Sequence, residues 1–589
     1  MKVFWNFSKR YILQYGWWYF LGFLFIVGTQ WLGVGIIAKV KDAIDAVDAA
    51  DATAATVLPF TYWIVAFALL LVVVRTASRL LIFTPGRMIE YHIRNDYYAN
   101  LLYLDRDFLS KQESGDLVSR CSNDIGYIRA AYGFGFLQVA NVSVTLVLVL
   151  AAMIRIDLRT TSFLAIPMAV SFTVIQISIS YLFSYWRRAN RQIGALSSLC
   201  LASYKGVAAI QNYHAEPAVE SRFNGLNGQY LGTMETVTRV KSFMIPLVQM
   251  VGNLSIFTVL WFVGPKVIDN RLSLGEIMAF LGYISMIMPP LLSLGWMLNV
   301  FNQAVPAMER LGEILDARPQ NPAVTGADTE KAPTSVGLAA KNLGFRFPAG
   351  KGETDPFALH NISFSLPPGK VLGVVGPLGS GKSALLDTLL RLNHPTPGQL
   401  FLNGRDVAGM DLNEYRAHFS FTPQRSLLFS TTLRNNLLVA LPAEQWDQPD
   451  TEQRLLETLD YAGFHLDANQ FPLGLETQVG QKGVMLSGGQ RQRMALARSL
   501  LRKAEIFVFD DVLSAVDHET EKAIIANIRR FAAGKSFIVV SHRVSAVQWA
   551  DEILVLRKGT VEARGSHETL INQPGFYREI YRYQSQHES

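Results

Sequence analysis

The 589-residue sequence has few of the residues that form cross-links. Its two cysteines, Cys121 and Cys200, exclude a disulfide framework and provide no cluster of thiol ligands for a metal. Charge is also scarce, because charged residues make up 17% of the chain against about 25% in average soluble proteins. Half of the residues are hydrophobic, and this excludes both a disordered protein and an ordinary cytosolic one.

Positive charges exceed negative charges only slightly. The net charge is +6 at neutral pH, which is little for a chain of this length. Membrane proteins place extra Lys and Arg in their cytosolic loops, so this excess requires no nucleic-acid partner.

The few charges are unevenly distributed. Six windows without a charged residue lie before residue 310, and each exceeds the ~18 apolar residues that suggest a membrane span. They cover residues 11–38, 52–74, 130–154, 160–186, 242–265 and 277–308. A buried core helix could explain one window, but it explains six poorly, and no window of this length follows residue 337. We expect six transmembrane helices, with both termini on one side of the membrane.

The connections between these windows predict the orientation. Residues 39–56, 155–159 and 266–276 are short connections, whereas residues 84–129 and 187–241 are long, polar and rich in Arg. The positive-inside rule places the two long connections and both termini in the cytosol.

The N-terminal segment is expected to form an interfacial helix over residues 1–15. Phe4, Trp5 and Phe7 stand there beside basic residues, as in helices that lie in the membrane surface. The alternative is an ordinary flank of the first span.

Two arginines lie inside the second apolar stretch. Arg75 and Arg79 are four residues apart, so they share one face of a helix. Charged residues within a span tend to face a cavity or a partner. These arginines either contact anionic groups of a substrate or form a structural or interfacial pair, and the sequence does not decide between the two.

The long polar connections are expected to be helical, because they contain few helix-breaking residues. Turns are expected near residues 108–115 and 212–220, with further breaks at Pro217, Gly225 and Gly228. At ~1.5 Å rise per residue, such helices project tens of ångströms beyond the bilayer. A helix that leaves the membrane, turns and returns would act as a lever. The alternative is a solvated hairpin without a partner.

The composition changes near residue 319. Residues 319–335 are rich in Pro, Ala, Thr and charge and are expected to link two domains. A transmembrane domain would cover residues 1–318 and a second domain residues 336–589. In the second domain, short β-rich runs such as residues 371–375 and 506–509 alternate with helical stretches. This alternation is typical of a parallel sheet with crossover helices.

One β-rich run leads directly into a phosphate-binding loop. Residues 376–383 read Gly-Pro-Leu-Gly-Ser-Gly-Lys-Ser and match the pattern G-x-x-x-x-G-K-[ST] between a strand and a helix. The glycines let backbone N–H groups close around phosphate oxygens, and the helix N-terminus adds its dipole. Lys382 would supply positive charge to the β- and γ-phosphates, and Ser383 would supply a hydroxyl to Mg²⁺. The expected ATP-binding residues here are Gly376, Gly379, Ser380, Gly381, Lys382, Ser383 and Ala384.

A second motif is an apolar strand that ends in a carboxylate. Residues 506–509 precede Asp510, and in phosphate-loop NTPases an Asp at this place helps to hold Mg²⁺. An isolated Asp510 could equally cap a turn. Together with the upstream phosphate loop, it is expected to bind the metal.

A third motif precedes another helical run. It consists of Leu486, Ser487, Gly488, Gly489 and Gln490. A Ser and two glycines before a helix form another N-terminus that suits an anion. One chain thus carries two phosphate-directed surfaces that are far apart in the sequence.

These motifs together resemble those of the ATP-binding cassette (ABC) transporters, whose signature is LSGGQ. The resemblance covers the whole chain, with six spans and then one cassette, as in half-size exporters of the type IV fold. It is close to the multidrug-resistance-like bacterial subunits that work as heterodimers, and residues 293–299 and 577–584 also look like theirs. The resemblance implies that two nucleotide domains dimerise head to tail. Each ATP would then lie between the phosphate loop of one domain and the signature of the other.

The same resemblance implies further site residues. Gln424 would touch Mg²⁺ and the membrane domain, His542 would sense the γ-phosphate, and Phe347 would stack on adenine. The expected Mg²⁺ ligands are Ser383, Gln424 and Asp510. The family usually has Tyr where Phe347 stands, and Phe keeps the aromatic face.

The chain departs from the family at Asp511. Members that hydrolyse ATP fast carry Glu after the strand-end Asp, as the general base for the attacking water. Asp is one methylene shorter, and a misplacement of ~1 Å can lower a rate on the order of 10²-fold. The chain's own site is therefore expected to bind ATP and turn over slowly. The alternative is that Asp511 reaches through a water molecule and works normally. Residues 514–517 match the family's D-loop.

The expected function is ATP-driven export across the cytoplasmic membrane. The substrate would be a hydrophobic or amphipathic drug, lipid or peptide, and the cofactors would be ATP and Mg²⁺. The expected partners are the lipid bilayer and a second, Glu-bearing half-transporter, with no nucleic acid. The alternatives are a homodimeric exporter in which Asp511 is a working base, an importer on the same fold, and a non-transporting ATP-gated regulator.

Overall fold

The chain divides into two compact units, Met1–Arg318 and Pro319–Ser589, each with its own hydrophobic core. The computed structural model describes residues 2–49, 53–105, 108–109, 111–317, 336–347, 357–480, 485–513, 516 and 518–587. The expected linker, residues 319–335, lies outside these described residues.

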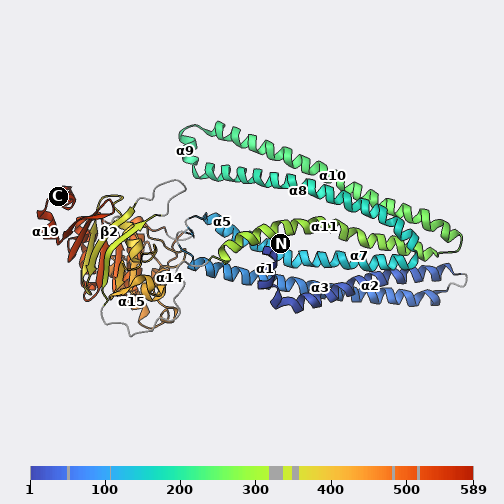
Figure 1. The fold of residues 1–589 in the computed structure, drawn as a ribbon, viewed down its shortest axis with the longest axis horizontal. Helices are drawn as coiled ribbons and strands as arrows, with labels where there is room; N and C mark the ends of the chain where they lie inside the picture. The colour runs from blue at the N-terminus through green and yellow to red at the C-terminus, as the bar shows by residue number, and fades with distance from the viewer. Residues whose placement is uncertain are drawn as a thin grey trace. The chain divides into compact units, whose positions relative to one another are not determined.

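Six long helices form the first unit in the described part of the chain (Figure 1). They are α2 (Gly16–Asp48), α3 (Ala54–Tyr103), α7 (Phe136–Ile156), α8 (Leu158–Lys205), α10 (Glu216–Ile268) and α11 (Leu274–Leu315). Each expected apolar window overlaps one of them. Shorter elements are α1 (Lys2–Tyr11), η1 (Leu13–Tyr15), α5 (Ser114–Ser119), α6 (Ile125–Ala130) and α9 (Val207–Asn212), with π-helical turns η2 (Arg120–Asp124) and η3 (Ala131–Gly135).

Three helical stretches within the described residues are long and apolar enough to cross a membrane. They are Leu13–Asp48, Ala54–Tyr103 and Ser114–Ile156, and the shorter apolar helices are Gly252–Ile268 and Leu274–Pro290. The short connections are tighter than the sequence suggested. Residues 39–48, expected in a connection, continue α2.

The long helix α3 continues well past its apolar window because a buried stripe supports its second half. Ile82, Ile89, Ile93 and Tyr97 are at most 1% exposed and recur at spacings of seven and four residues. This spacing places them on one helical face, which packs in the core with α6 and α11. Arg75 and Arg79 lie earlier in α3, and both are exposed.

The second long connection forms a helical hairpin of α8, α9 and α10 (Figure 1). The chain turns at residues 213–215, where His214 has a φ of 49°. The expected breaks at Gly225 and Gly228 are wrong, because α10 continues through both glycines. Each helical glycine costs about 1 kcal/mol relative to alanine, and packing along α8 offsets that amount. Pro217 lies in the first turn of α10, where its missing N–H disturbs no hydrogen bond.

The N-terminal helix α1 is only partly as expected. Phe7 is 8% exposed, and its ring lies 5.8 Å from that of Tyr11. The ring of Phe4 lies 5.7 Å from that of Tyr132, so both phenylalanines pack on protein. Only Trp5, at 71% exposed, keeps the solvent- or lipid-facing position that an interfacial helix requires.

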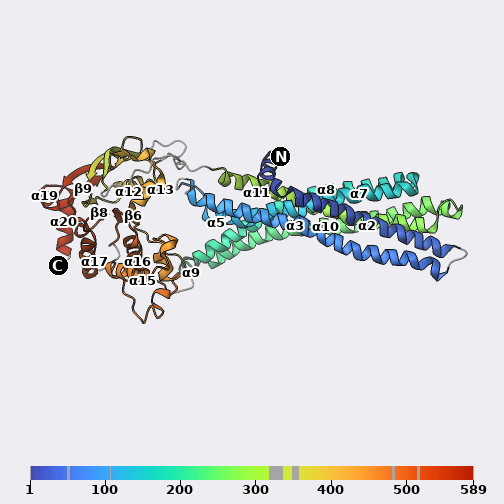
Figure 2. The ribbon, with the colours of Figure 1, turned by 90° about the horizontal axis from the view of Figure 1, so that it is seen from below.

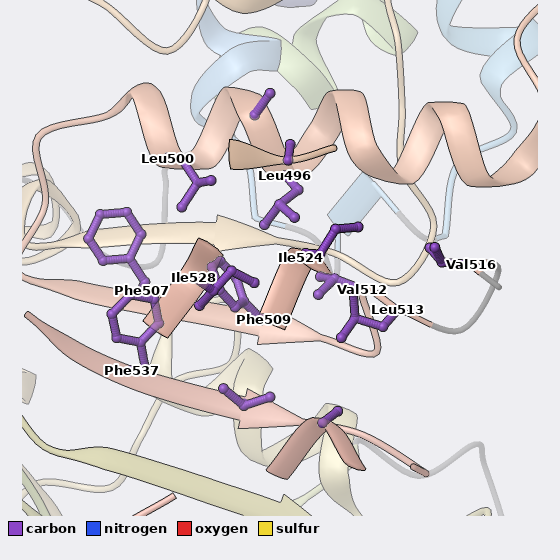
Figure 3. Packing of buried hydrophobic residues seen from close by; sticks show 14 of the residues in the cluster. Leu496, Leu500, Phe507, Phe509, Val512, Leu513, Val516, Ile524, Ile528 and Phe537 are labelled. Carbon is purple, nitrogen blue, oxygen red and sulfur yellow. The ribbon is translucent and has the colours of Figure 1, made fainter. Parts of the chain in front are cut away.

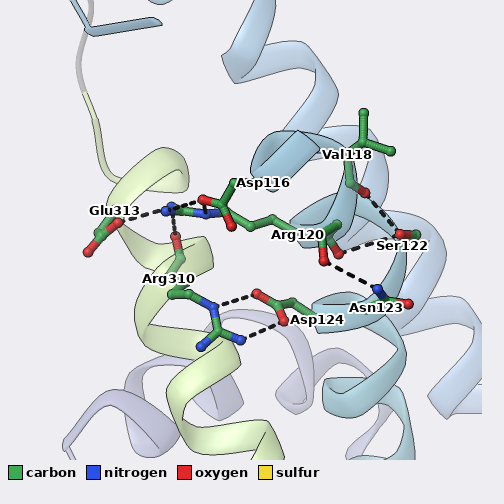
Figure 4. A network of polar contacts seen from close by, with 9 residues as sticks. Asp116, Val118, Arg120, Ser122, Asn123, Asp124, Arg310 and Glu313 are labelled. Carbon is green, nitrogen blue, oxygen red and sulfur yellow. Dashed lines mark hydrogen bonds and ion pairs between the residues drawn. The ribbon is translucent and has the colours of Figure 1, made fainter. Parts of the chain in front are cut away.

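A polar network joins the π-helical turn η2 to the end of α11 (Figure 4). The Nε of Arg120 donates to Asp116 at 2.8 Å, and its Nη1 donates to Glu313 at 3.0 Å and to the carbonyl oxygen of Arg310 at 2.9 Å. Arg310 in turn donates two hydrogen bonds, of 2.8 and 2.6 Å, to the two carboxylate oxygens of Asp124. Arg120 and Asp124 are 7% and 4% exposed. Because each buried charge has a partner, the network fixes α11 against α5 and η2.

Two sheets build the second unit (Figure 2). A six-stranded sheet has the order β10-β9-β3-β8-β7-β6, and an antiparallel sheet has the order β2-β1-β4-β5. The strands are β1 (Leu338–Arg346), β2 (Phe357–Leu366), β3 (Val371–Val375), β4 (Leu400–Leu402), β5 (Arg405–Asp406), β6 (Phe419–Thr422), β7 (Ile506–Asp510), β8 (Ser536–Val540), β9 (Glu552–Arg557) and β10 (Thr560–Gly565). The helices are α12 (Lys382–Leu389), α13 (Leu412–Ala417), α14 (Leu433–Leu438), α15 (Thr451–Tyr461), α16 (Gly488–Leu501), α17 (His518–Phe531), α18 (Val544–Val547), α19 (His567–Asn572) and α20 (Phe576–His587).

The interior strand β7 has an apolar core on each face. Phe507 and Phe509 point into one cluster with residues of α16 and α17 (Figure 3), whereas Ile506 and Val508 point into the other. Strand side chains alternate between the two faces, so a fully apolar strand must lie between two covered faces. Burial on both faces fixes the position of Asp510, with which the strand ends.

Candidate functional site

Four strand ends bring the predicted residues to one edge of the six-stranded sheet. Strands β3, β8, β7 and β6 are neighbours and run parallel. The phosphate loop follows β3, Asp510 ends β7, and His542 and Gln424 come two residues after β8 and β6. Ligands of open α/β sheets bind at this carboxyl edge of the strands.

The phosphate loop needs its glycines for two different reasons. Gly379 and Gly381 have φ values of +75° and +101°, which residues with a Cβ rarely adopt. A Cβ on Gly376 would lie 2.3 Å from the carbonyl oxygen of Leu556 and 2.6 Å from Oγ of Ser380. Backbone conformation and close packing therefore both select the predicted sequence.

The lysine of the loop curls over the backbone that precedes it. Its Nζ donates to the carbonyl oxygens of Gly376 at 2.7 Å and Pro377 at 3.0 Å. Lys382 is 8% exposed, and burial lowers its pKa, while the charges of Asp511 and Asp510 act in the opposite direction. The ammonium group thus lies inside the loop and near both carboxylates.

The carboxyl group of Asp510 is a weaker acid than an ordinary aspartate side chain. Burial raises its pKa to about 6, and the negative charges of Asp511 and Asp387 add to the shift. The nearby Lys382 only partly offsets this. The site therefore contains more negative charge than its own cations balance.

Asp511 is buried, and donors from three described residues bind its carboxylate. Its Oδ1 accepts from Oγ of Ser541 at 3.1 Å and from the backbone N of His542 at 3.5 Å, and its Oδ2 accepts from Nε2 of Gln424 at 3.4 Å. The residue is 6% exposed and has a φ of 49°, a conformation that Asp tolerates better than most residues. Its backbone N donates to the carbonyl oxygen of Val540 at 2.8 Å. Asp511 therefore connects the ends of β7, β8 and β6.

These residues fit a magnesium ion. The hydroxyl of Ser383, the amide of Gln424 and the carboxylate of Asp510 are the hard oxygen donors that Mg²⁺ prefers, and a divalent cation would offset the excess charge that raises the pKa of Asp510. Ser383 and Gln424 are exposed at the sheet edge. Within the described residues, no cluster of three His, Cys, Asp or Glu forms a metal site by itself. A metal at this edge would thus take further ligands from phosphate oxygens and water.

His542 is half-buried beside charged groups, whereas Phe347 is exposed. Burial lowers the pKa of His542, the charge of Lys382 adds to this, and Asp511 acts in the opposite direction. Phe347 follows β1 directly and is 52% exposed, with its ring edge-on to that of Phe345 at 5.1 Å. An exposed aromatic face can stack on a base.

The signature residues form the start of α16. Oγ of Ser487 accepts from the backbone N of Gln490 at 3.1 Å, and Oε1 of Gln490 accepts from the backbone N of Ser487 at 2.9 Å. This reciprocal pair is a capping box. Ser487 and Gly488 are exposed, and Gly489 is half-buried. The first turn of the helix therefore faces outward, with its side chains already ordered.

The structure brings the phosphate loop, Asp510, Asp511, Gln424 and His542 together, but it gives the signature different neighbours. The phosphate-loop helix α12 packs on β2 and β7, whereas α16 packs on α14, α15 and β6. D-loop residues 514, 515 and 517 lie outside the described residues.

Sequence reasoning missed four residues that surround His542. They are Ser541, Glu521, Arg543 and Gln584. Glu521 carried no signal in the sequence. Gln584 could have been noticed from the helical spacing of residues 577, 581 and 584, which share one face of α20.

Comparison with known proteins agrees with this architecture. A family profile described as ABC transporter matches residues 359–514, and one described as ABC transporter transmembrane region matches residues 19–291. The chain is 31% identical over 528 residues to the multidrug resistance-like ATP-binding protein MdlA of Escherichia coli, covering 89% of this chain and 87% of that protein. It is 28% identical over 499 residues to the ATP-dependent lipid A-core flippase of Pseudomonas fluorescens, covering 83% and 79%.

A solved structure is similar in fold. The structure of a bacterial Atm1-family ABC exporter with ATP bound superposes with a TM-score of 0.77, covers 98% of both chains and is 21% identical. The predicted fold class, a helical transmembrane domain followed by an α/β phosphate-loop domain, is confirmed. The chain belongs to the ABC transporter family, as a multi-pass membrane protein whose ATP-binding domain drives transport.

Proposed function

We propose that the chain is one half of a heterodimeric exporter and that its own ATP site is hydrolytically weak. The partner would be a homologous half-transporter with Glu at the position of Asp511. Together they would export a hydrophobic or amphipathic substrate from the cytoplasmic membrane. The residue that carries the proposal is Asp511.

The surroundings of Asp511 support a weak base. Both carboxylate oxygens accept hydrogen bonds from described protein groups, among them Oγ of Ser541 at 3.1 Å and Nε2 of Gln424 at 3.4 Å. A general base must reach the water that it activates. Asp is one methylene shorter than Glu, and the buried apolar residues Val512 and Leu513 anchor the backbone that follows it. A backbone fixed in this way limits the shift that could compensate for the short side chain.

Two exposed surfaces support a second half-transporter. The first is the signature turn of α16, whose capping box is formed. Helix α16 packs on other elements than the phosphate-loop helix α12 does. The second is the α8–α10 hairpin, where Tyr204 and Tyr213 are 82% and 83% exposed. Both side chains lie within ten residues of one another around α9 and are available to a protein partner.

The cycle that we propose follows from these positions. ATP at the phosphate loop would be contacted by Lys382, and Mg²⁺ held by Ser383, Gln424 and Asp510 would offset charge on the phosphates. His542 would respond to the γ-phosphate, and the signature of the partner would close over it. The predicted turns near residues 108–115 and 212–220 would carry closure to the spans and open the cavity outward. Hydrolysis, mainly at the partner's site, would reset the transporter.

The names of the relatives guide the substrate class. They describe multidrug resistance in one case and lipid A-core flipping in another. Both suggest apolar or amphipathic molecules that enter from the bilayer, so we propose a drug, lipid or peptide of that kind. Accumulation of substrate in inside-out vesicles on addition of ATP would support export, and its absence would favour an importer or a non-transporting regulator.

The decisive test of asymmetry uses Asp511 itself. In the native complex, Asp511→Ala should change steady-state ATPase only modestly, while Gln at the corresponding Glu of the partner should nearly abolish it. The matched variant Asp511→Glu should raise turnover of this chain's own site, by up to ~10²-fold if side-chain length limits it. Purified without a partner, the chain should hydrolyse ATP slowly. Brisk, cooperative hydrolysis by the chain alone that Asp511→Ala removes would overturn the heterodimer.

A further inference from the structure

The C-terminal helix α20 holds the loop that carries His542. Nε2 of Gln584 donates to the carbonyl oxygen of His542 at 2.9 Å, and Oε1 of Gln584 accepts from the backbone N of Val544 at 2.9 Å. One side-chain amide thus uses both of its ends on the backbone, on either side of Arg543. An amide bound at both ends has a defined orientation, and it defines the backbone to which it binds.

Gln584 lies on a firmly anchored face of its helix. Tyr577 is 2% exposed, and its hydroxyl lies 2.8 Å from Nδ1 of His567. The ring of Tyr581 lies edge-on to His567 at 5.3 Å. Tyr577, Tyr581 and Gln584 are spaced by four and three residues, so one helical face carries the two anchors and the amide. The amide is therefore held by a packed helix and does not depend on a loose chain end.

The rest of the loop is fixed through other residues. Arg543 donates to the carboxylate of Glu521, and Oγ of Ser545 donates to the same carboxylate at 2.5 Å. Ser541 donates to Asp511 at the opposite end of the loop. Within the described part of the chain, Gln584 is the side chain that bonds to both the carbonyl oxygen of His542 and the backbone N of Val544. The backbone that sets the direction of the imidazole therefore depends on α20.

We propose that Gln584 is a positioning residue for His542. It does not touch ATP, but it fixes the backbone from which the imidazole projects toward the sheet edge. The inference rests on the proposed role of His542 at the γ-phosphate. It couples the order of the C-terminal helix to the ATP site, because any displacement of α20 would release the carbonyl oxygen of His542.

The first test measures the backbone directly in the full-length transporter. Gln584→Leu removes both hydrogen bonds, and an adjacent cavity of about 320 Å³, lined by Ser545, Gln548 and Tyr581 among others, leaves room for the branched side chain. Hydrogen exchange at the Val544 amide should accelerate at least about tenfold. Gln584→Glu keeps an acceptor for Val544 but faces the carbonyl oxygen of His542 with a second acceptor, so exchange at Val544 should stay near wild type. Arg582→Ala, on the exposed side of the same helix, is the matched control.

The second test asks whether Gln584 acts through His542. The measurement is beryllium-fluoride trapping of labelled ADP on this subunit of the native complex, which mimics the γ-phosphate and needs no turnover at this weak site. Gln584→Leu should reduce trapping severalfold, and Gln584→Glu should do the same despite its near-normal exchange at Val544. Combining Gln584→Leu with His542→Ala should give no further loss beyond His542→Ala alone, since a positioning residue has nothing left to position.

The outcomes separate the two proposals. Additive losses in the double variant, or unchanged exchange at Val544 in Gln584→Leu, would overturn the positioning role while leaving His542 in place. Normal trapping in His542→Ala would overturn the proposed role of His542, and the positioning role would fall with it. Loss of folding in Gln584→Leu would appear as accelerated exchange throughout β7 and β8, and Gln584→Glu would then decide by its trapping alone.

Discussion

The helices α12 and α16 both begin with a glycine-rich segment suited to an anion, and they differ in how far the chain itself surrounds them. At α12, Ser380 and Lys382 are 2% and 8% exposed, and the strand ends of β6, β7 and β8 supply further groups. At α16, Ser487 and Gly488 are exposed, and the groups nearest to them belong to the helix itself.

The difference shows that the chain itself supplies the groups around the phosphate loop, whereas it leaves the signature open to another molecule. The phosphate loop is built around charge, with a buried lysine opposite two carboxylates. The signature is built around shape: residues 486–490 carry no charged side chain, and the adjacent Arg491 donates to the carbonyl oxygen of Leu486 at 2.7 Å. A prepared but open helix start supports the proposed partner, whose phosphate loop would face it.

The largest effect on ATPase is expected at the open surface, which is the exposed signature at the start of α16. Ser487→Arg places bulk and charge where the partner's nucleotide would dock, and loss of such a contact can lower turnover on the order of 10²-fold. ATPase of the complex should collapse although the chain's own phosphate loop is intact. Ser566→Arg is the matched control, because Ser566 also caps an exposed helix start, that of α19, away from any predicted ATP contact. Full ATPase in Ser487→Arg would contradict the head-to-tail arrangement.

A smaller effect, on nucleotide affinity, is expected at the enclosed surface, which is the phosphate loop before α12. Lys382→Ala removes a charge-assisted contact to phosphate, worth about 1.5–3 kcal/mol, so nucleotide affinity of this subunit should fall about tenfold or more. Photolabelling with an azido-ATP should weaken on this subunit and persist on the partner. Lys370→Ala, at the start of the same β3 region and paired with Asp551 at 2.8 Å, controls for loss of a lysine in general. Equal labelling of Lys382→Ala and wild type would reject the predicted role.

The enclosed surface was also the easier one to predict. Gly376 to Ser383 and Asp510 follow from local sequence patterns, because a strand, a glycine-rich turn and a helix lie next to one another in the chain. Their neighbourhood then follows from the rule that parallel strand ends meet at one edge. The apolar windows predicted the long helices for the same reason, since each window is a local property.

Features that depend on distant contacts escaped prediction. Gln584 binds residues about forty positions away, at a separation that no local pattern encodes. Gly225 and Gly228 were expected to break a helix, yet packing along α8 outweighs their low helix propensity. Phe4 was expected at the membrane surface, but its ring packs on those of Tyr132 and Phe301, which are far away in the sequence. In each case a tertiary contact outweighed the local preference.

Nucleotide binding at the phosphate-loop surface should depend on pH. Asp510 has a pKa of about 6, raised chiefly by burial, so it gains a proton as the pH falls through 6 and loses the charge that Mg²⁺ requires. Mg²⁺-dependent binding of a fluorescent ATP analogue to this subunit should weaken severalfold between pH 7 and 5.5. His542→Asn separates any titration of the histidine from that of Asp510.

The stability of the ATP-binding unit should depend on pH in the opposite direction to its Mg²⁺-dependent ATP binding. A raised carboxyl pKa means that the native state binds more protons than the unfolded one between about pH 4 and 6, so this group's contribution to stability falls as the pH rises through that window. Without Mg²⁺, Asp510→Asn should therefore stabilise the ATP-binding unit at pH 7. Destabilisation by Asp510→Asn in the absence of Mg²⁺ would contradict the excess of negative charge at this edge.

The smallest effect is expected from the residue that steadies the signature. Nε2 of Gln490 donates to Oε1 of Gln470 at 2.8 Å, and Nε2 of Gln470 donates back to Oε1 of Gln490 at 3.3 Å. Loss of a pair of this kind costs about 1 kcal/mol. Gln470→Ala should therefore lower ATPase of the complex only a fewfold and leave nucleotide labelling of this subunit unchanged. Gln470→Glu keeps the acceptor for the shorter hydrogen bond and should retain most of the activity. Unchanged ATPase in both Gln470→Ala and Gln470→Glu would show that the amide of Gln490 needs no support from Gln470, and that the capping box alone orders the start of α16.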